Sequence, residues 1–269
     1  MSGLELYTAG ILGGQLLDAK YHIKNDVMLA QHVVRAALPY LIKSNRGKAL
    51  FWYYFEDSAR KNRDRTAIVF PRPKKNPPPI ELDELGAQIL ESQFELELYT
   101  YKELYNIVLR LSYIFKEQYG ITSKDTIALN CMNKPLFLFV WLALWNIGAL
   151  PAFLNVNSKG EPLVHCMKIL NVSQVFIDPD CTEAIRETEP LIRKDLPNVK
   201  LNYMNEQELL RVLSDPKSPK YRAPDHTRRP EDVAASCCLL IYTLGTTGLP
   251  KAGIMLWRKA FMASSLFGY

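Results

Sequence analysis

Residues 126–154 read T-I-A-L-N-C-M-N-K-P-L-F-L-F-V-W-L-A-L-W-N-I-G-A-L-P-A-F-L, and this stretch decides the fold class. Residues 126–131 are mostly β-branched or apolar and predict a buried strand. Residues 136–147 predict a buried helix that ends at Gly148, and residues 149–154 predict a second buried strand. Two buried strands joined through a helix are typical of α/β proteins with parallel strands.

The same alternation continues on both sides of this stretch. Thr100 and Glu103 form a capping-box pattern, and apolar residues at helical spacing follow it as far as Phe115. Residues 174–177 and 199–203 predict further strands, with helices between and after them. We therefore expect an α/β fold with a largely parallel sheet flanked by helices, which binds ligands at the carboxyl ends of its strands.

Residues 135–158 contain no charged residue, so a membrane-spanning helix is an alternative for this stretch. Asn146, Gly148 and Pro151 interrupt it, which favours a buried helix followed by a buried strand. A membrane-spanning transporter is therefore a hypothesis that fails if these residues are buried against a sheet.

The composition is that of an ordinary folded protein. The chain has 269 residues and a formal net charge of +5, without a long Lys/Arg block. Nucleic-acid binding usually needs a concentrated basic face, so we expect no nucleic-acid partner. The five cysteines and four histidines show no disulfide or metal-ligand spacing, so we assign no metal site. Reduced, mostly buried thiols in an intracellular protein are expected at Cys131, Cys166, Cys181, Cys237 and Cys238.

The first 46 residues read as a leader to the main fold. Apolar residues recur at helical spacing from Val27 to Leu41, after a cap at Asn25 or Asp26. Such a helix can pack on the main domain or lie on a membrane surface. We expect residues 1–46 to be a helical leader of this kind and residues 47–269 to form the main domain.

Residues 239–251 read L-L-I-Y-T-L-G-T-T-G-L-P-K, in which an apolar strand runs into a turn rich in glycine and threonine. Glycines allow backbone N–H groups to converge on phosphate oxygens, and the hydroxyl groups and the lysine add donors. The turn does not match the Walker A pattern G-x-x-x-x-G-K-[ST]. A turn of this composition can also simply join two strands, but the ordered string after a buried strand favours phosphate binding.

The string T-x-G-T-T-G-x-P-K resembles the signature of acyl-CoA synthetases and related AMP-forming enzymes. Other segments, from about residue 51 onward, resemble the family of fungal very-long-chain fatty acid transport proteins and acyl-CoA synthetases. They are Y-N-I-V-L-R-L-S (105–112), N-K-P-L-F-L-F-V-W-L-A-L-W-N-I-G-A-L-P-A-F-L-N (133–155), P-L-V-H-C-M-K (162–168), V-F-I-D-P-D (175–180), L-P-N-V-K-L-N-Y (196–203) and I-M-L-W-R-K (254–259).

The resemblance implies the fold of the N-terminal domain of adenylate-forming synthetases and a two-step reaction. ATP and a long- or very-long-chain fatty acid would form an acyl-adenylate with the help of Mg²⁺, and CoA would then take the acyl group. It also implies coupling to fatty acid uptake at a membrane surface, that of the endoplasmic reticulum, peroxisome, lipid droplet or plasma membrane. The residues that would hold the ATP β- and γ-phosphates are Thr243, Gly245, Thr246, Thr247, Gly248 and Lys251. No catalytic residue is assigned.

The sequence departs from the family pattern in two respects. Leu244 stands where the family usually has Ser, which removes a hydroxyl donor beside the phosphates. The family's later motifs are absent, so we expect residues 47–269 to be an incomplete AMP-binding domain that is not a competent ligase alone. The alternative is a non-catalytic, membrane-associated lipid-handling protein derived from the same family. Formation of a thioester from ATP, fatty acid and CoA distinguishes the two.

Other residues with chemical potential have simpler interpretations. His165 lies on a predicted helix, where a packed or surface histidine is the usual case. Asp178 and Asp180 follow a predicted strand and are expected to start a turn or cap a helix. Trp141 and Trp145 are four residues apart on an apolar helix, which favours core packing.

Overall fold

The computed structural model describes residues 23–78, 93–228, 235–243 and 250–261, together with residues 18 and 20. The chain divides into two compact units. The larger unit is Leu50–Trp257, and the smaller one joins Met1–Ala49 with Arg258–Tyr269. The domain boundary that the sequence predicts between residues 46 and 47 stays a prediction.

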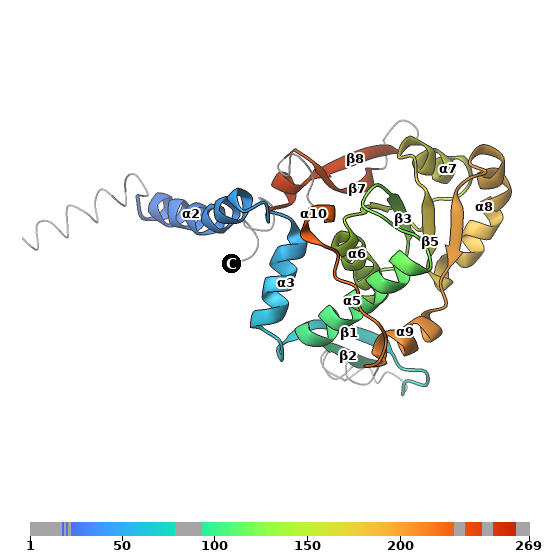
Figure 1. Cartoon of the computed structure of the whole chain (residues 1–269), viewed down its shortest axis with the longest axis horizontal. Coiled ribbons are helices and arrows are strands. Elements are labelled where there is room, and N and C mark those ends of the chain that lie inside the picture. The colour runs from blue at the N-terminus through green and yellow to red at the C-terminus, as the bar shows by residue number, and fades with distance from the viewer. Residues whose placement is uncertain are drawn as a thin grey trace, which may run out of the picture. The chain divides into compact units, whose positions relative to one another are not determined.

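The larger unit is built on a six-stranded sheet with the strand order β6-β5-β3-β4-β7-β8 (Figure 1). Neighbouring strands from β6 to β7 are parallel, and β8 is antiparallel to β7. The predicted α/β class with a largely parallel sheet is therefore confirmed. The strands are β3 (Thr126–Asn130), β4 (Leu150–Phe153), β5 (Gln174–Ile177), β6 (Lys200–Tyr203), β7 (Cys237–Thr243) and β8 (Lys251–Leu256).

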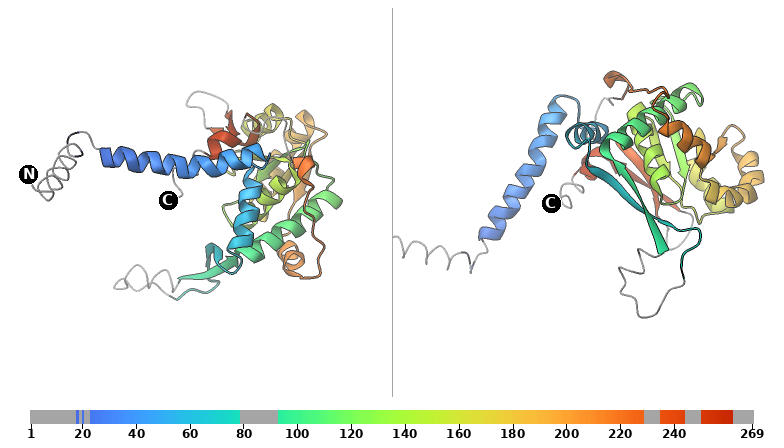
Figure 2. Two further views of the ribbon diagram at one scale, coloured as in Figure 1. Left: turned by 60° about the vertical axis from the view of Figure 1, so that its left-hand side comes forward. Right: turned by 90° about the horizontal axis from the view of Figure 1, so that it is seen from below.

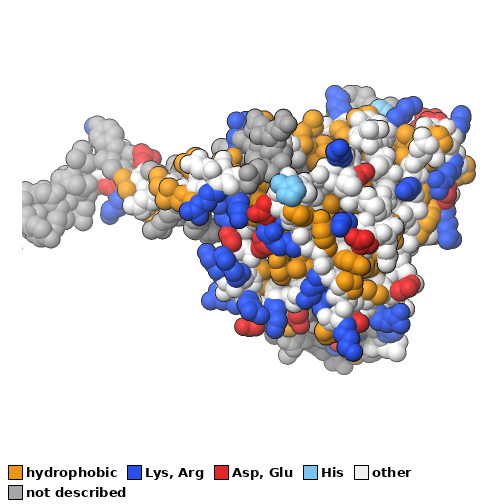
Figure 3. Space-filling view, viewed as in Figure 1, with side chains coloured by type: hydrophobic (Ala, Val, Ile, Leu, Met, Phe, Trp, Pro, Cys, Tyr) orange, Lys and Arg blue, Asp and Glu red, His pale blue; other side chains and the backbone are white. Residues whose placement is uncertain are grey.

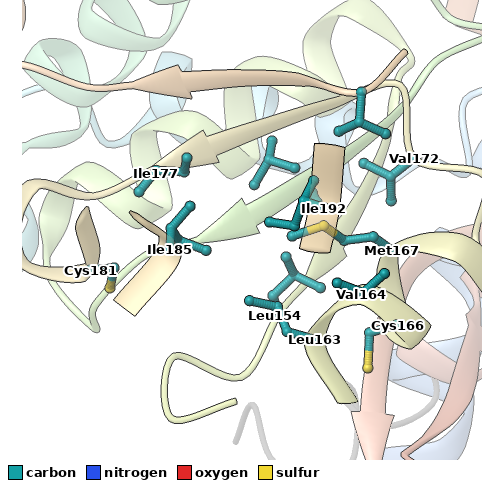
Figure 4. Packing of buried hydrophobic residues seen from close by; sticks show 13 residues of the cluster. Leu154, Leu163, Val164, Cys166, Met167, Val172, Ile177, Cys181, Ile185 and Ile192 are labelled. Atoms are coloured by element: carbon teal, nitrogen blue, oxygen red, sulfur yellow. The ribbon is translucent and has the colours of Figure 1, made fainter. Parts of the chain in front are cut away.

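Helices cover both faces of this sheet. On one face, α7 and α8 pack on alternate residues of the central strands, and Figure 4 shows this cluster around Ile177, Ile192 and Met167. On the other face, the ring of Phe176 contacts Phe115 of α5, with ring centroids 4.7 Å apart. The helices are α3 (Phe51–Lys61), α5 (Tyr101–Glu117), α6 (Pro135–Ile147), α7 (Gly160–Ile169), α8 (Thr182–Asp195), α9 (Glu206–Ser214) and α10 (Asp225–Arg228).

The helix α5 begins at the capping box that the sequence predicts. The Thr100 hydroxyl accepts a hydrogen bond from the Glu103 N–H, and the Glu103 carboxylate accepts one from the Thr100 N–H at 2.8 Å. The apolar face that follows is buried as far as Phe115. Local sequence therefore fixes both the start of this helix and the face that it turns to the core.

The uncharged stretch forms the predicted helix and strand. The helix α6 ends at Gly148, which adopts a left-handed conformation with φ of +95° and leads into β4. Ten of its thirteen residues are buried, so this stretch is a core element of the sheet domain. No helix in the described ranges is both long enough and apolar enough to cross a membrane.

A two-stranded antiparallel ribbon, β1 (Thr66–Pro73) and β2 (Phe94–Thr100), lies beside α5, and Figure 2 shows it from two further sides. Residues 66–70 and 95–101 predict two strands that lie side by side, and this pairing is confirmed. The prolines between residues 71 and 79 predict a surface loop over residues 71–91, which is wrong at its start, because β1 continues through Pro71 and Pro73. Proline is tolerated there because β1 pairs with only one neighbouring strand.

The smaller unit contains one long helix, α2 (Ile23–Asn45). It covers the segment in which the sequence predicts a helix, although it begins before Asn25. Its apolar side chains are exposed: Val27, Met28, Val34, Leu38, Leu41 and Ile42 are each 45–60% accessible to solvent. Hydrophobic and basic side chains of α2 are both visible in Figure 3.

Candidate phosphate-binding site

The segment predicted to bind phosphate joins β7 to β8. The strand β7 ends at Thr243, β8 begins at Lys251, and these two residues are partners across the antiparallel pair. Opposed residues in such a pair have Cα atoms about 4.5–5.5 Å apart, so the strands hold the two ends of the connection together. Residues 244–249, which include Leu244, Gly245, Thr246, Thr247 and Gly248, lie outside the described part of the chain.

The ends of this connection lie at the edge of the sheet where ligands are expected. The strand β7 runs parallel to β4, with Ala152 opposite Leu240. Thr243 is the last residue of β7, so it lies at the edge where the parallel strands have their carboxyl ends. Open α/β sheets bind ligands at the carboxyl ends of their strands. The Lys251 side chain is exposed at this edge, and Pro250 before it is buried. A phosphate approaching this edge would therefore meet a cation on a fixed strand.

Side-chain hydrogen bonds fasten β7 to the helices on both faces of the sheet. The Tyr242 hydroxyl donates to the carbonyl oxygen of Cys166 in α7, and Trp145 Nε1 in α6 donates to the carbonyl oxygen of Cys238 at 2.8 Å. Burial raises the pKa of Tyr242, so its hydroxyl stays protonated and available as a donor. The strand that leads into the phosphate segment is thus held rigidly.

A second charged cluster at the same edge centres on Lys134, directly before α6. Its Nζ lies 2.8 Å from Asp178 Oδ1, 2.9 Å from Asp180 Oδ2 and 2.8 Å from Glu206 Oε2. The side chain of Lys134 is only 10% exposed, and that of Asp178 is fully buried. These residues follow β3, β5 and β6, which are neighbours in the sheet. The cluster therefore ties three strand ends together.

The ammonium group of Lys134 is fully occupied in this cluster. Burial opposes its charge, but hydrogen bonds to Asp178, Glu206 and Asp180 outweigh that effect and raise its pKa. An ammonium group has three N–H donors, and here three carboxylates accept them. Lys134 is therefore a structural cation. The Lys251 side chain, by contrast, is exposed at the start of β8.

The sequence predicts part of this cluster. Asp178 accepts a hydrogen bond from the Asp180 N–H at 2.9 Å and caps a short 3-10 helix, η1 (Pro179–Cys181), which confirms the expected turn or cap. The role of Lys134 was missed. A usable signal was present, because charged residues follow three predicted strands, and the carboxyl ends of parallel strands share one edge.

The other residues with chemical potential, which are two tryptophans, one histidine and the cysteines, are packed in the fold. The rings of Trp141 and Trp145 pack with centroids 4.8 Å apart, as the sequence predicts, and His165 is half-buried on α7.

All five cysteines are free thiols. Burial raises the pKa of Cys166 and Cys181 to about 11, so these thiols are protonated and poorly nucleophilic at neutral pH. Within the described ranges, no three His, Cys, Asp or Glu residues are arranged to hold a metal ion.

Comparison with known proteins identifies the family to which the chain is similar. The family model of AMP-binding enzymes matches residues 55–267, which include the whole phosphate segment. The very long-chain fatty acid transport protein of Saccharomyces cerevisiae is 45% identical over 94% of this chain and 36% of its own length. The human long-chain fatty acid transport protein 6 is 27% identical over 64% of this chain and 28% of its own length.

The fold is also that of solved adenylate-forming enzymes. The fatty acyl CoA synthetase of Mycobacterium tuberculosis superposes with a TM-score of 0.57 at 13% identity, over 78% of this chain and 35% of that chain. The chain thus spans about a third of the length of these proteins. With the family model covering residues 55–267 and the fold in agreement, the chain belongs to the family of AMP-binding enzymes.

Proposed function

We propose that this chain carries the phosphate-binding part of a fatty acid–CoA ligase. Such an enzyme activates a long- or very-long-chain fatty acid with ATP as an acyl-adenylate and transfers the acyl group to CoA. The observation that carries the proposal is the segment T-L-G-T-T-G-L-P-K, whose two ends, Thr243 and Lys251, are partners in paired strands at the carboxyl edge of the sheet. The fatty acid transport proteins to which the chain is similar supply the substrate class.

The residues of this edge suit the phosphates of ATP bound with Mg²⁺. In the proposal, Thr243, Gly245, Thr246, Thr247 and Gly248 donate backbone or hydroxyl hydrogen bonds, and Lys251 supplies a positive charge. Donors fixed in advance stabilise the charge that develops on pyrophosphate as it leaves the acyl-adenylate. The hydrogen bonds that attach β7 to α6 and α7 support this proposal, because they fix the strand that leads into the segment.

Calorimetric titration of the 269-residue chain with Mg·ATP and with Mg·pyrophosphate tests the proposal. We expect saturable binding of both, weakened about 10- to 100-fold in Lys251→Met, because a hydrogen bond to a charged group contributes about 1.5–3 kcal/mol. The control is Lys200→Met, which removes an exposed lysine from the opposite edge of the sheet. Absence of binding, or equal binding by both variants, contradicts the proposal.

The second candidate function is non-catalytic lipid handling, and Leu244 favours it. A leucine in place of the family's serine removes one hydroxyl donor beside the phosphates. Mass spectrometry of acyl-CoA formed from ATP, a long-chain fatty acid and CoA separates the candidates. Thioester formation establishes the ligase, whereas fatty acid binding without nucleotide binding establishes the second function.

A further inference from the structure

The two units of the chain differ sharply in charge. The larger unit, Leu50–Trp257, contains 25 Lys and Arg and 25 Asp and Glu, so its formal charge is zero. The smaller unit contains eight basic and three acidic residues and carries the whole net charge of +5. Its basic residues are Lys20, Lys24, Arg35, Lys43, Arg46, Lys48, Arg258 and Lys259, and its acidic residues are Glu5, Asp18 and Asp26.

The same small unit exposes an apolar stripe. Val27, Val34, Leu38 and Leu41 recur at intervals of three, four and seven residues, which places them on one face of α2. Ile42 adjoins this face, and each of these side chains is at least 45% exposed. A row of exposed apolar side chains on one helix face marks an interaction surface.

Charged residues determine how such a helix can meet a membrane. Lys24, Asp26, Arg35 and Lys43 lie within the 23 residues of α2, and charged side chains are costly at the centre of a bilayer. A helix with an apolar face, flanking basic residues and little overall hydrophobicity lies instead in the plane of the interface. Its basic residues then gain from the negative potential of anionic lipids.

We propose that α2 docks in the plane of an anionic lipid surface, with its apolar stripe inserted and its flanking basic residues on the lipid headgroups. This proposal goes beyond the one above, because it assigns contact with a membrane surface to one segment and one lipid class. It does not depend on nucleotide binding by the phosphate segment, so the two can fail separately. The larger unit has a formal charge of zero and therefore adds no net attraction to the same lipids.

Vesicle co-sedimentation of the 269-residue chain tests this docking. Vesicles of phosphatidylcholine alone are compared with vesicles that also contain phosphatidylserine, at low and at high salt. We expect binding to the anionic vesicles, with a marked loss at high salt because exposed charges are then screened. We also expect extraction of bound protein by high salt, which would not release a spanning helix.

Matched pairs of variants separate the apolar from the electrostatic contribution. Val34→Ser with Leu38→Ser removes two stripe residues, and the control is Val69→Ser with Leu98→Ser. The control residues are opposed on the β1–β2 ribbon and are each 57% exposed, so they match the stripe in exposure. We expect the stripe variant to bind at least about tenfold more weakly and the ribbon variant to bind like the wild type.

The second pair addresses charge. Arg46→Gln with Lys48→Gln removes two exposed cations from the small unit, and Lys74→Gln with Lys75→Gln removes two from the larger unit. We expect about tenfold or greater loss of binding for the first pair only, since a basic residue near an anionic surface contributes about 1 kcal/mol.

Three outcomes would overturn the docking proposal. The first is absence of vesicle binding together with a concentration-dependent dimer that the stripe variant abolishes, which would assign the stripe to a second copy. The second is equal binding to neutral and anionic vesicles, which would remove the electrostatic part. The third is equal loss in the stripe and ribbon variants, which would show that any exposed apolar pair behaves alike.

Discussion

Removing the Lys134 ammonium is the most discriminating perturbation of the sheet domain. Lys134→Met keeps the apolar stem and deletes the charge that three carboxylates share. The side chain of Asp178 is fully buried and would lose its counter-charge, whereas Asp180 is 64% exposed and can be solvated. The energetic cost therefore comes chiefly from Asp178, and from Glu206, which is 17% exposed.

The expected loss of stability is large. Breaking a buried ion pair by removing one partner costs about 3–5 kcal/mol, because the remaining charge stays buried. For a chain of this size, each kcal/mol lowers Tm by about 2–4 °C, so we expect a decrease of about 6–20 °C. Asp178→Asn in the Lys134→Met background should recover part of this loss, because it neutralises the unpaired carboxylate.

Urea unfolding followed by far-UV circular dichroism measures the difference, and the chain offers a matched control. Lys159 Nζ lies 2.8 Å from Glu187 Oε2, the same distance as in the buried cluster, but both side chains are more than half exposed. Lys159→Met should cost far less than Lys134→Met, because both charges of the exposed pair are solvated and screened. Equal losses in the two variants would refute the argument that burial makes the Lys134 cluster important for the free energy of unfolding.

The same cluster predicts a pH dependence. The pKa of Lys134 is raised on folding, so its stabilisation is fully present below the ordinary lysine pKa of 10.5 and is lost as pH rises through the folded value. The stability difference between wild type and Lys134→Met should therefore be constant from pH 7 to 9 and shrink in stronger alkali. A difference that already shrinks between pH 7 and 9 contradicts the raised pKa.

Three further predictions concern β7 and its surroundings. Leu244→Ser should strengthen Mg·ATP binding about 10- to 100-fold by calorimetry if it restores a hydroxyl donor, and unchanged affinity would exclude that role. Gly148→Ala should cost more than about 1–2 kcal/mol in urea unfolding, since φ is +95° and a Cβ would lie 3.1 Å from Arg228 Cα; a neutral change contradicts this. Tyr242→Phe should cost about 0.5–1.5 kcal/mol by removing the hydrogen bond to the Cys166 carbonyl oxygen, and a loss too small to measure speaks against that bond.

The local parts of the fold were predictable from the sequence. The Thr100–Glu103 capping box and the stop at Gly148 act through neighbouring residues, so their patterns are visible without knowledge of the fold. The end of β1 was predicted wrongly because Pro71 is excluded from central strands but tolerated in a strand with one neighbour. Whether a strand has one neighbour or two is a property of the sheet, which the local pattern does not contain.

The candidate site also has one part that local sequence predicts and one part that depends on the fold. Its phosphate segment is a continuous string and was recognisable as such, whereas the Lys134 cluster joins residues up to 72 positions apart. Finding that cluster requires the strand order β6-β5-β3, which brings Glu206 and Asp178 to the side of Lys134. Likewise, the opposition of Thr243 and Lys251 follows from the antiparallel turn of β8, which the sequence did not predict.

The net charge of the whole chain conceals how unevenly charge is distributed between its two units. A value of +5 spread over 269 residues is small and indicates no particular partner. Once the chain is divided into its units, the larger one is neutral, and the same charge falls on a short unit whose helix also exposes an apolar stripe. Electrostatic attraction to an anionic surface and insertion of apolar side chains act together only when they share one element. The structure supplies that coincidence, and the vesicle experiment with its matched ribbon control measures whether the lipid surface responds to it.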